Sequence, residues 1–170
     1  MIMLKKINLK MILCLVAAVL GFVAAMMLFA PALKAETLLG GESTLKGSEI
    51  AFGKKVNGSD YLTASAYMLP LFLAIVGVVL SVLALLGKGG KIVPVVAAVC
   101  FVAAAILFFL PKVLITPDLG KLDGDAKSKA LENFREGVKK SYDLSAGPIV
   151  GGILSIISAV AVSVPLFIKK

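Results

Sequence analysis

Charged side chains are absent from four long stretches of this 170-residue chain, and histidine is absent throughout. The four stretches cover residues 11–33, 61–86, 92–111 and 144–168, and each has at least 20 residues. A helix that rises about 1.5 Å per residue needs about 20 apolar residues to cross a hydrocarbon core about 30 Å thick. The stretches therefore predict four transmembrane helices. They lack the ionisable groups on which intramembrane proton relays and ion sites depend.

Cysteine is scarce, and the positions of the two cysteines exclude further kinds of site. Cys14 and Cys100 both lie inside apolar stretches, so disulfide bonds do not staple the loops. Without histidine a zinc site is excluded. The sequence Asp123-Gly-Asp125-Ala-Lys127 departs from the EF-hand calcium pattern at the third ligand position. No acid or base accompanies a serine or cysteine nucleophile within the stretches. We therefore expect no cofactor, no metal site and no enzymatic activity.

The remaining composition is typical of a membrane protein. Hydrophobic residues make up 59% of the chain and charged residues 16%, against about 25% charged in soluble domains. We expect an all-α membrane protein in which residues 1–170 form one domain, a bundle of four transmembrane helices. Two outer loops would cover 34–60 and 112–143, and both are too small to be separate domains.

The net charge of +8 does not indicate a nucleic-acid partner, because its distribution follows the predicted topology. Seven lysines and no acidic residue lie in 1–10, 87–91 and 169–170, whereas all ten acidic residues lie in the two outer loops. The positive-inside rule places such lysine segments, and so both termini, on the cytoplasmic side of a cell membrane. The outer loops hold 11 basic residues, which is more, but at a lower density.

The first stretch has a second interpretation, as a cleaved signal peptide. Residues 30–35 resemble a cleavage region, with the cut before Glu36. Signal peptides have apolar cores of about 7 to 15 residues, and the uninterrupted stretch 11–33 is longer than that. We expect the helix to be retained as an anchor, with cleavage as the alternative.

Glycines mark a turn at 87–91, between the second and third stretches. Gly87 can cap the preceding helix, and Gly89 and Gly90 favour a tight turn, so an antiparallel pair of helices is expected. Pro94 would fall in the first turn of the third helix, where a missing N–H costs nothing. The predicted inner turn thus connects two spans directly.

The fourth stretch carries a row of small residues at every fourth position. Small side chains at this spacing form a groove that lets a neighbouring backbone approach closely within a membrane. The groove would either pack inside this bundle or dock a second subunit. Its members are Gly147, Gly151, Ser155, Ala159 and Ser163.

The first outer loop contains a pattern typical of a small β-hairpin. Thr44–Lys46 and Glu49–Phe52 flank the pair Gly47-Ser48, which suits a two-residue turn. In that arrangement Ile50 and Phe52 share one face. A lone hairpin is marginal in water, so this face would rest on the helices or on a partner.

The second outer loop contains an amphipathic helical pattern from Ala126 to about Lys140. Ala130, Leu131, Phe134 and Val138 fall on one stripe, and Asp125 can cap the start. We expect this helix to lie over the bundle or in the membrane interface. In the alternative interpretation, the apolar stripe of this helix would bind a partner protein.

The layout of four spans, a short inner turn, a β-containing first outer loop and a helical second outer loop resembles the claudin-type tetraspan plan. The claudin motifs do not follow, because the chain has no tryptophan and no cysteine pair in the first outer loop. The Ala51-Phe52-Gly53 stretch and residues 105–110 are similar to small uncharacterised four-span proteins of low-GC Gram-positive bacteria. This second resemblance implies that the protein lies in a bacterial cell membrane. It brings no assigned activity with it.

Two functions fit these expectations. The first is a non-catalytic accessory or scaffolding subunit that contacts a membrane-protein partner, or a second copy, through the groove and the outer loops. The alternative is a small channel or transporter for uncharged or apolar solutes. Pro70 and Gly147–Gly152 would then interrupt helices, and Ser81, Ser155 and Ser158 would line an aqueous path.

Topology can be measured with single cysteines in a background that lacks Cys14 and Cys100. Cysteines placed at Ser43 and Ser128 should react in intact cells with a maleimide that cannot cross the membrane, because both positions lie in outer loops. A cysteine at Gly89 should stay unlabelled until the cells are opened. If only the cysteine at Gly89 were labelled, the orientation of the chain in the membrane would be the reverse of the predicted one.

Overall fold

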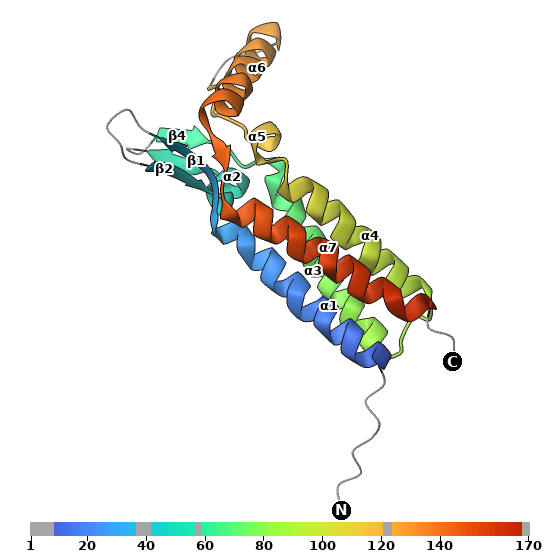
Figure 1. Ribbon diagram of the computed structural model, residues 1–170. Coiled ribbons are helices and arrows are strands. Elements are labelled where there is room, and N and C mark those ends of the chain that lie inside the picture. The colour runs from blue at the N-terminus through green and yellow to red at the C-terminus, as the bar shows by residue number, and fades with distance from the viewer. Residues whose placement is uncertain (1–8, 37–41, 57–58, 121–123, 168–170) are drawn as a thin grey trace, which may run out of the picture.

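Four apolar helices lie side by side in the computed structural model, which describes residues 9–36, 42–56, 59–120 and 124–167 (Figure 1). Helix α1 packs against α3 and α7, and α4 packs against the same two helices, so the four form a closed ring. The helices are α1 (Leu9–Met26), α3 (Leu69–Leu85), α4 (Ile92–Phe108) and α7 (Ala146–Phe167).

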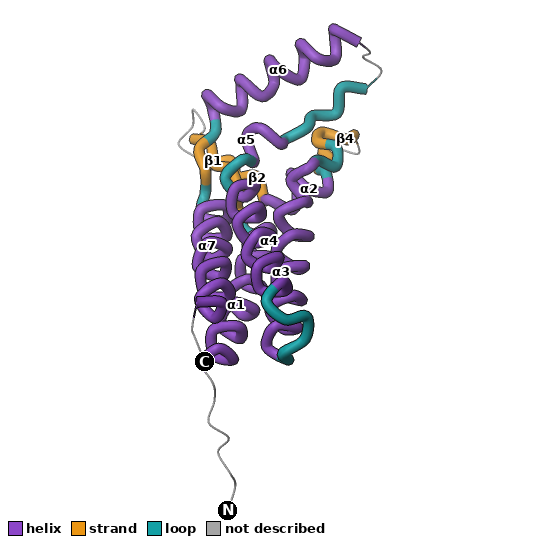
Figure 2. The backbone as a smooth tube through the Cα atoms, turned by 90° about the vertical axis from the view of Figure 1, so that its right-hand side faces the viewer, coloured by secondary structure: helices purple, strands orange, loops and turns teal. Residues whose placement is uncertain are grey.

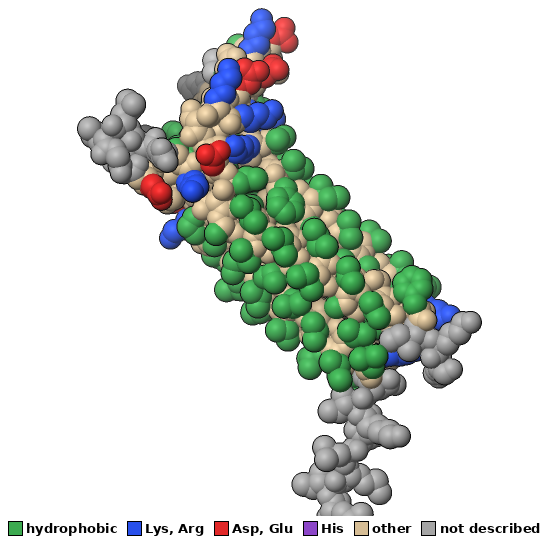
Figure 3. Space-filling view, in the orientation of Figure 1, with side chains coloured by type: hydrophobic (Ala, Val, Ile, Leu, Met, Phe, Trp, Pro, Cys, Tyr) green, Lys and Arg blue, Asp and Glu red, His purple; other side chains and the backbone are tan. Residues whose placement is uncertain are grey.

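Three helical segments are long and apolar enough to cross a membrane. They are Leu9–Phe29, Ala66–Leu85 and Ala146–Phe167, whereas α4 is a shorter apolar helix. The outward surface of the bundle is covered by hydrophobic side chains (Figure 3). Exposed apolar surface of this extent is typical of a surface that contacts lipid or another protein rather than water. The structure confirms a mostly helical fold that contains three long apolar helices and a small sheet.

All four predicted spans begin or end differently in the structure. Helix α4 ends at Phe108 rather than Pro111, α7 begins at Ala146 rather than Leu144, and the first two spans differ more. The first apolar stretch leaves the helical conformation after the short 3-10 helix η1 (Met27–Phe29), and Pro31 begins strand β1. The second stretch starts in strand β4, and α3 begins only after η2 (Ala66–Met68). Apolar composition does not distinguish a buried strand from a helix, so the stretches were longer than the helices. The end predicted for the fourth span, Ile168, lies outside the described residues.

Neither proline expected to interrupt a helix does so. Pro70 and Pro148 lie in the first turns of α3 and α7, where the missing N–H has no partner to lose. The turn between α3 and α4 contains positive φ angles of 72° at Gly87, 80° at Gly89 and 59° at Gly90. Glycine adopts this left-handed conformation without a steric penalty, which allows the chain to reverse within the six residues between α3 and α4.

A small head covers one end of the bundle (Figures 1 and 2). Its three-stranded antiparallel sheet has the order β2-β1-β5, with β1 (Pro31–Glu36), β2 (Glu42–Lys46) and β5 (Asp143–Leu144). Leu33 of β1 pairs with Leu45 on one side and Leu144 on the other. The sheet therefore joins the segment that leaves α1 to the segment that enters α7. A second sheet pairs β3 (Lys54–Val56) with β4 (Ser59–Leu62).

The predicted hairpin around Gly47-Ser48 is wrong, because Gly47–Phe52 forms helix α2. The N–H of Lys46 donates to the Glu49 carboxylate at 2.9 Å, which satisfies a free donor at the start of the helix. The N–H of Gly47 donates to the carbonyl of Ala30 at 3.1 Å, and a Cβ atom at Gly47 would overlap the carbonyl oxygen of Leu28. Glycine is thus needed here for close backbone approach, not for a hairpin turn.

Large apolar side chains from the head and the adjacent helix ends form one core. Ile50 is fully buried in it, whereas Phe52 is 51% exposed, because residues two apart point to opposite sides of a helix. Tyr67 is buried, and its hydroxyl donates a hydrogen bond to the carbonyl of Phe108 at 3.3 Å. The core contains Leu28, Leu33, Leu45, Ile50, Leu62, Tyr67, Phe108, Ile115 and Val138.

The position of α2 predicts unequal effects for Ile50 and Phe52. Ile50→Ala should lower the free energy of unfolding by about 2–5 kcal/mol, because it leaves a cavity in the head core. Phe52→Ala should change it by less than about 0.5 kcal/mol, as expected for an exposed side chain. Chemical denaturation in detergent, followed by circular dichroism, measures both. Equal losses would mean that the two residues share a buried face, as a hairpin requires.

Candidate packing and contact surfaces

The row of small residues on α7 packs against the chain itself. Gly147, Gly151, Ser155 and Ala159 are buried, and Ser163 is partly exposed. A Cβ atom added at Gly147 would lie 2.7 Å from the carbonyl oxygen of Pro31. One added at Gly151 would lie 3.1 Å from the ring of Phe108. The groove therefore receives the β1 segment and α4, and its buried part is not available to a second subunit.

The serine hydroxyls inside the bundle bond to their own helices. Ser155 donates to the carbonyl of Gly151, Ser158 to that of Leu154, and Ser81 to that of Gly77, each at 2.8 Å. Serine commonly bonds to the carbonyl four residues earlier when no other acceptor is near. All three side chains are fully buried, so their hydroxyls are satisfied without water.

Phe101 of α4 occupies the centre of the bundle, and sequence reasoning did not single it out. Its ring is fully buried and lies against Gly21 of α1 and Gly77 of α3. A Cβ atom at Gly77 would come within 2.7 Å of this ring. The small residues at 21 and 77 were visible in the sequence, but only the fold shows which large side chain they accommodate.

Helix α6 (Gly124–Ser141) extends away from the bundle and is held at its C-terminal half (Figures 1 and 2). Val138 is buried in the head core. The guanidinium Nε of Arg135 donates to the carbonyl of Ile115 at 3.4 Å. Lys112 donates to the carbonyl of Lys139 at 3.5 Å, and its Nζ lies 3.9 Å from the Asp143 carboxylate. Contacts of this kind fix the angle at which α6 leaves the head.

A groove of about 360 Å³ lies between α6 and the short helix α5 (Pro111–Leu114). Its apolar part is formed by Leu131, which is half-buried, and by Val113, which is exposed. Charged side chains of both signs, including Glu132 and Arg135, surround it. Of the outer-loop residues predicted for partner contact, Leu131 lines this groove and Phe52 is exposed on α2. Ile50 and Val138 are buried in the head core, and the partly buried Phe134 packs against it.

Within the described part of the chain, no group of three or more His, Cys, Asp or Glu side chains is placed to hold a metal ion. Cys14 and Cys100 are free thiols on α1 and α4. At the head, the groove beside α6 is an accessible surface feature.

No family model, curated protein or solved structure matches this chain. The resemblances to claudin-type and to low-GC Gram-positive four-span proteins stay predictions. The geometry described above is therefore the basis for proposing a function.

The α7 groove predicts a position-specific loss of stability. Gly151→Leu should lower the free energy of unfolding in detergent by about 1–3 kcal/mol, because its side chain must displace the ring of Phe108. Val150→Leu is the matched control, because Val150 is exposed and a leucine there meets no neighbour that must move. Thermal unfolding and size-exclusion chromatography measure the effect. If Gly151→Leu matched the wild type while Val150→Leu did not, the packing face would be assigned to the wrong side of α7.

Proposed function

We propose that this chain is a non-catalytic integral membrane protein with four spans, in which α4 is the fourth. At 17 residues α4 is about 25 Å long, and the apolar Phe109 and Leu110 extend it toward the head. A bilayer accommodates a helix of this length by modest local thinning. The position of α4 between α3 and α7 supports this assignment, because both neighbours are long and apolar enough to cross a membrane.

In this proposal both termini lie in the cytoplasm. Lys10, Lys88 and Lys91 lie at the end of the bundle opposite the head, and the sequence places no acidic residue in the adjoining segments. The head contains the carboxylates and lies outside. The terminal lysines at 5, 6, 169 and 170 add to the inner charge by sequence and lie outside the described residues.

We propose further that the protein acts as an accessory or scaffolding subunit through helix α6. The observation that carries this proposal is the incomplete burial of its apolar stripe. Val138 is buried in the head core and Phe134 packs against that core, whereas Leu131, on the same stripe, stays partly exposed and lines the groove. An apolar patch with a charged rim is typical of a protein interface. The partner would therefore be a protein whose outer surface reaches the groove between α5 and α6.

The interior of the bundle supports this function over transport. The hydroxyls of Ser81, Ser155 and Ser158, which would have lined an aqueous path, are bonded to backbone carbonyls. The ring of Phe101 fills the centre of the bundle between glycines of two helices. A channel for uncharged solutes would need this ring to move.

The partner surface can be tested by photocrosslinking in living cells. A benzoylphenylalanine at Leu131 should form an adduct with one defined protein, identified by mass spectrometry after purification in mild detergent. The same probe at Asn133, which is exposed on another side of α6, should not form it. Substitution by serine of the exposed Val113, which lines the same groove, should reduce the Leu131 adduct several-fold, because it removes apolar contact area.

Adducts with a second copy of the chain would make the complex a homo-oligomer. Equal labelling from Leu131 and Asn133 would contradict the proposal, because contact would then not depend on the apolar stripe.

A further inference from the structure

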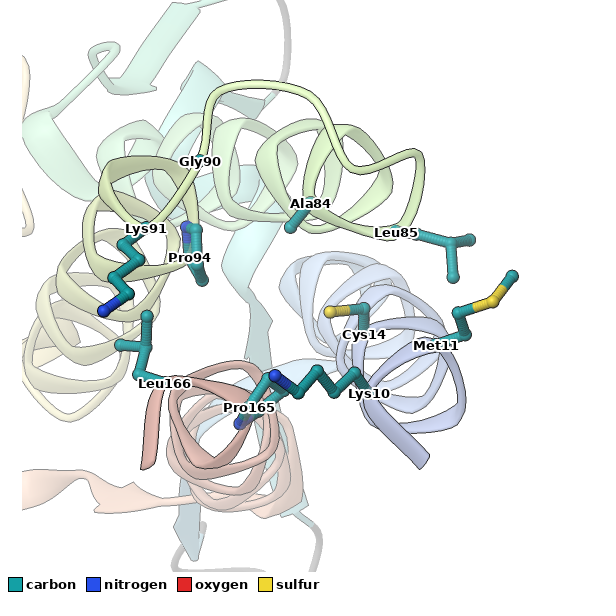
Figure 4. Close-up of a pocket in the computed structure, with 10 residues that line it drawn as sticks. All are labelled: Lys10, Met11, Cys14, Ala84, Leu85, Gly90, Lys91, Pro94, Pro165 and Leu166. Carbon is teal, nitrogen blue, oxygen red and sulfur yellow. The ribbon is translucent and has the colours of Figure 1, made fainter. Parts of the chain in front are cut away.

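A cavity of about 440 Å³ opens at the end of the bundle opposite the head (Figure 4). All four long helices contribute to it, since Cys14 comes from α1, Ala84 from α3, Pro94 from α4 and Leu166 from α7. These side chains make its wall largely apolar. Ligand sites in proteins commonly have volumes of about 300–1,000 Å³ and such walls.

Two lysines complete the lining of this cavity. Lys10 lies on α1 and is half-buried, and Lys91 directly precedes α4 and is exposed. Figure 4 shows the side chain of Lys10 extending toward Pro165 and that of Lys91 toward Leu166, so both reach the end of α7. The cavity thus combines an apolar wall with two ammonium groups that come from different helices.

No carboxylate in the described part of the chain neutralises these two lysines. The ten acidic residues lie between positions 36 and 60 and between 118 and 143, in the segments that form the head. Two ion pairs among the described residues join Lys54 to Glu49 and Lys112 to Asp143, and both lie in the head. The positive charge beside the cavity is therefore free to attract an external anion.

The position of the cavity favours an anion that carries an apolar chain. Around it, the outward surface of the helices is the hydrophobic surface assigned to lipid. Basic pockets between helices at a membrane surface suit an acidic phospholipid, whose phosphate meets the lysines while its acyl chain follows the apolar wall. A free phosphate ion would use only the lysines and leave the wall unoccupied.

We propose that this cavity binds the headgroup and upper acyl chain of an anionic phospholipid, with Lys10 and Lys91 contacting the phosphate. The site would tie this end of the bundle to an acidic membrane leaflet. It depends on the membrane location of the bundle but not on a partner for α6. If lipid binding at this cavity were disproved, the proposed partner contact of α6 would be unaffected, and the reverse also holds.

Lipid binding to the full-length chain can be measured by native mass spectrometry in a neutral detergent, with phosphatidylglycerol as the probe. A basic residue near an acidic lipid surface contributes a factor of about five in affinity, so Lys10→Gln combined with Lys91→Gln should weaken binding about 30-fold. Lys88→Gln is the matched control. Lys88 lies in the same turn and does not line the cavity, so its loss should change the affinity less than about twofold.

A second variant tests whether the lipid enters the cavity. Ala84→Phe places a ring in the space between the helices and should weaken phosphatidylglycerol binding about as much as loss of both lysines, with the melting temperature unchanged. Phosphatidylcholine should bind weakly to every variant. Equal effects of the Lys88 and Lys10/Lys91 substitutions, or full binding by Ala84→Phe, would overturn the proposal. So would displacement of the lipid by excess inorganic phosphate, which would identify a free-anion site instead.

Discussion

Helices surrounded by lipid gain little by hiding apolar surface from each other, so close backbone packing must hold them together. In this chain the packing depends on small residues that make room for two rings of α4. Gly21 and Gly77 accommodate Phe101, and Gly151 accommodates Phe108 closer to the head. The four helices can approach one another only because these positions lack a side chain. The location of the head, of α6 and of the cavity at the other end all follow from that arrangement.

The chain contains two cores that differ in residue size. Within the bundle the buried residues are mostly alanine, as at positions 17, 74, 97 and 104, with Phe101 as the main exception. Within the head core most of them are larger, chiefly leucine and isoleucine, together with Tyr67 and Phe108. In the proposed topology the head faces water, where burial of large apolar side chains contributes about 25 cal/mol per Å². That contribution is missing in lipid, where small residues that allow contact between backbones contribute more.

The two ends of the molecule offer different chemistry. At the head, a partly covered apolar stripe on α6 lies among charges of both signs, which suits contact with another protein. At the opposite end, two lysines and an apolar cavity suit an acidic amphiphile. The charge asymmetry was visible in the sequence. The cavity was not, because its wall is assembled from four helices that are distant along the chain, and individual residues such as Ala84 carry no signal of such a role.

The sequence by itself determined the membrane character, the apolar helices, the glycine turn after α3 and the amphipathic helix that became α6, because each depends on local periodicity or local turn chemistry. Only the tertiary structure decided where the apolar stretches stop being helical. Leu33 is in a strand because Leu45 and the distant Leu144 pair with it, and no local pattern records that pairing. In the same way, Gly47 starts a helix because the backbone of Leu28 lies against it. The α7 groove was recognisable as a packing face, but its occupant, the chain's own β1 segment and α4, was decided by how the helices close into a ring.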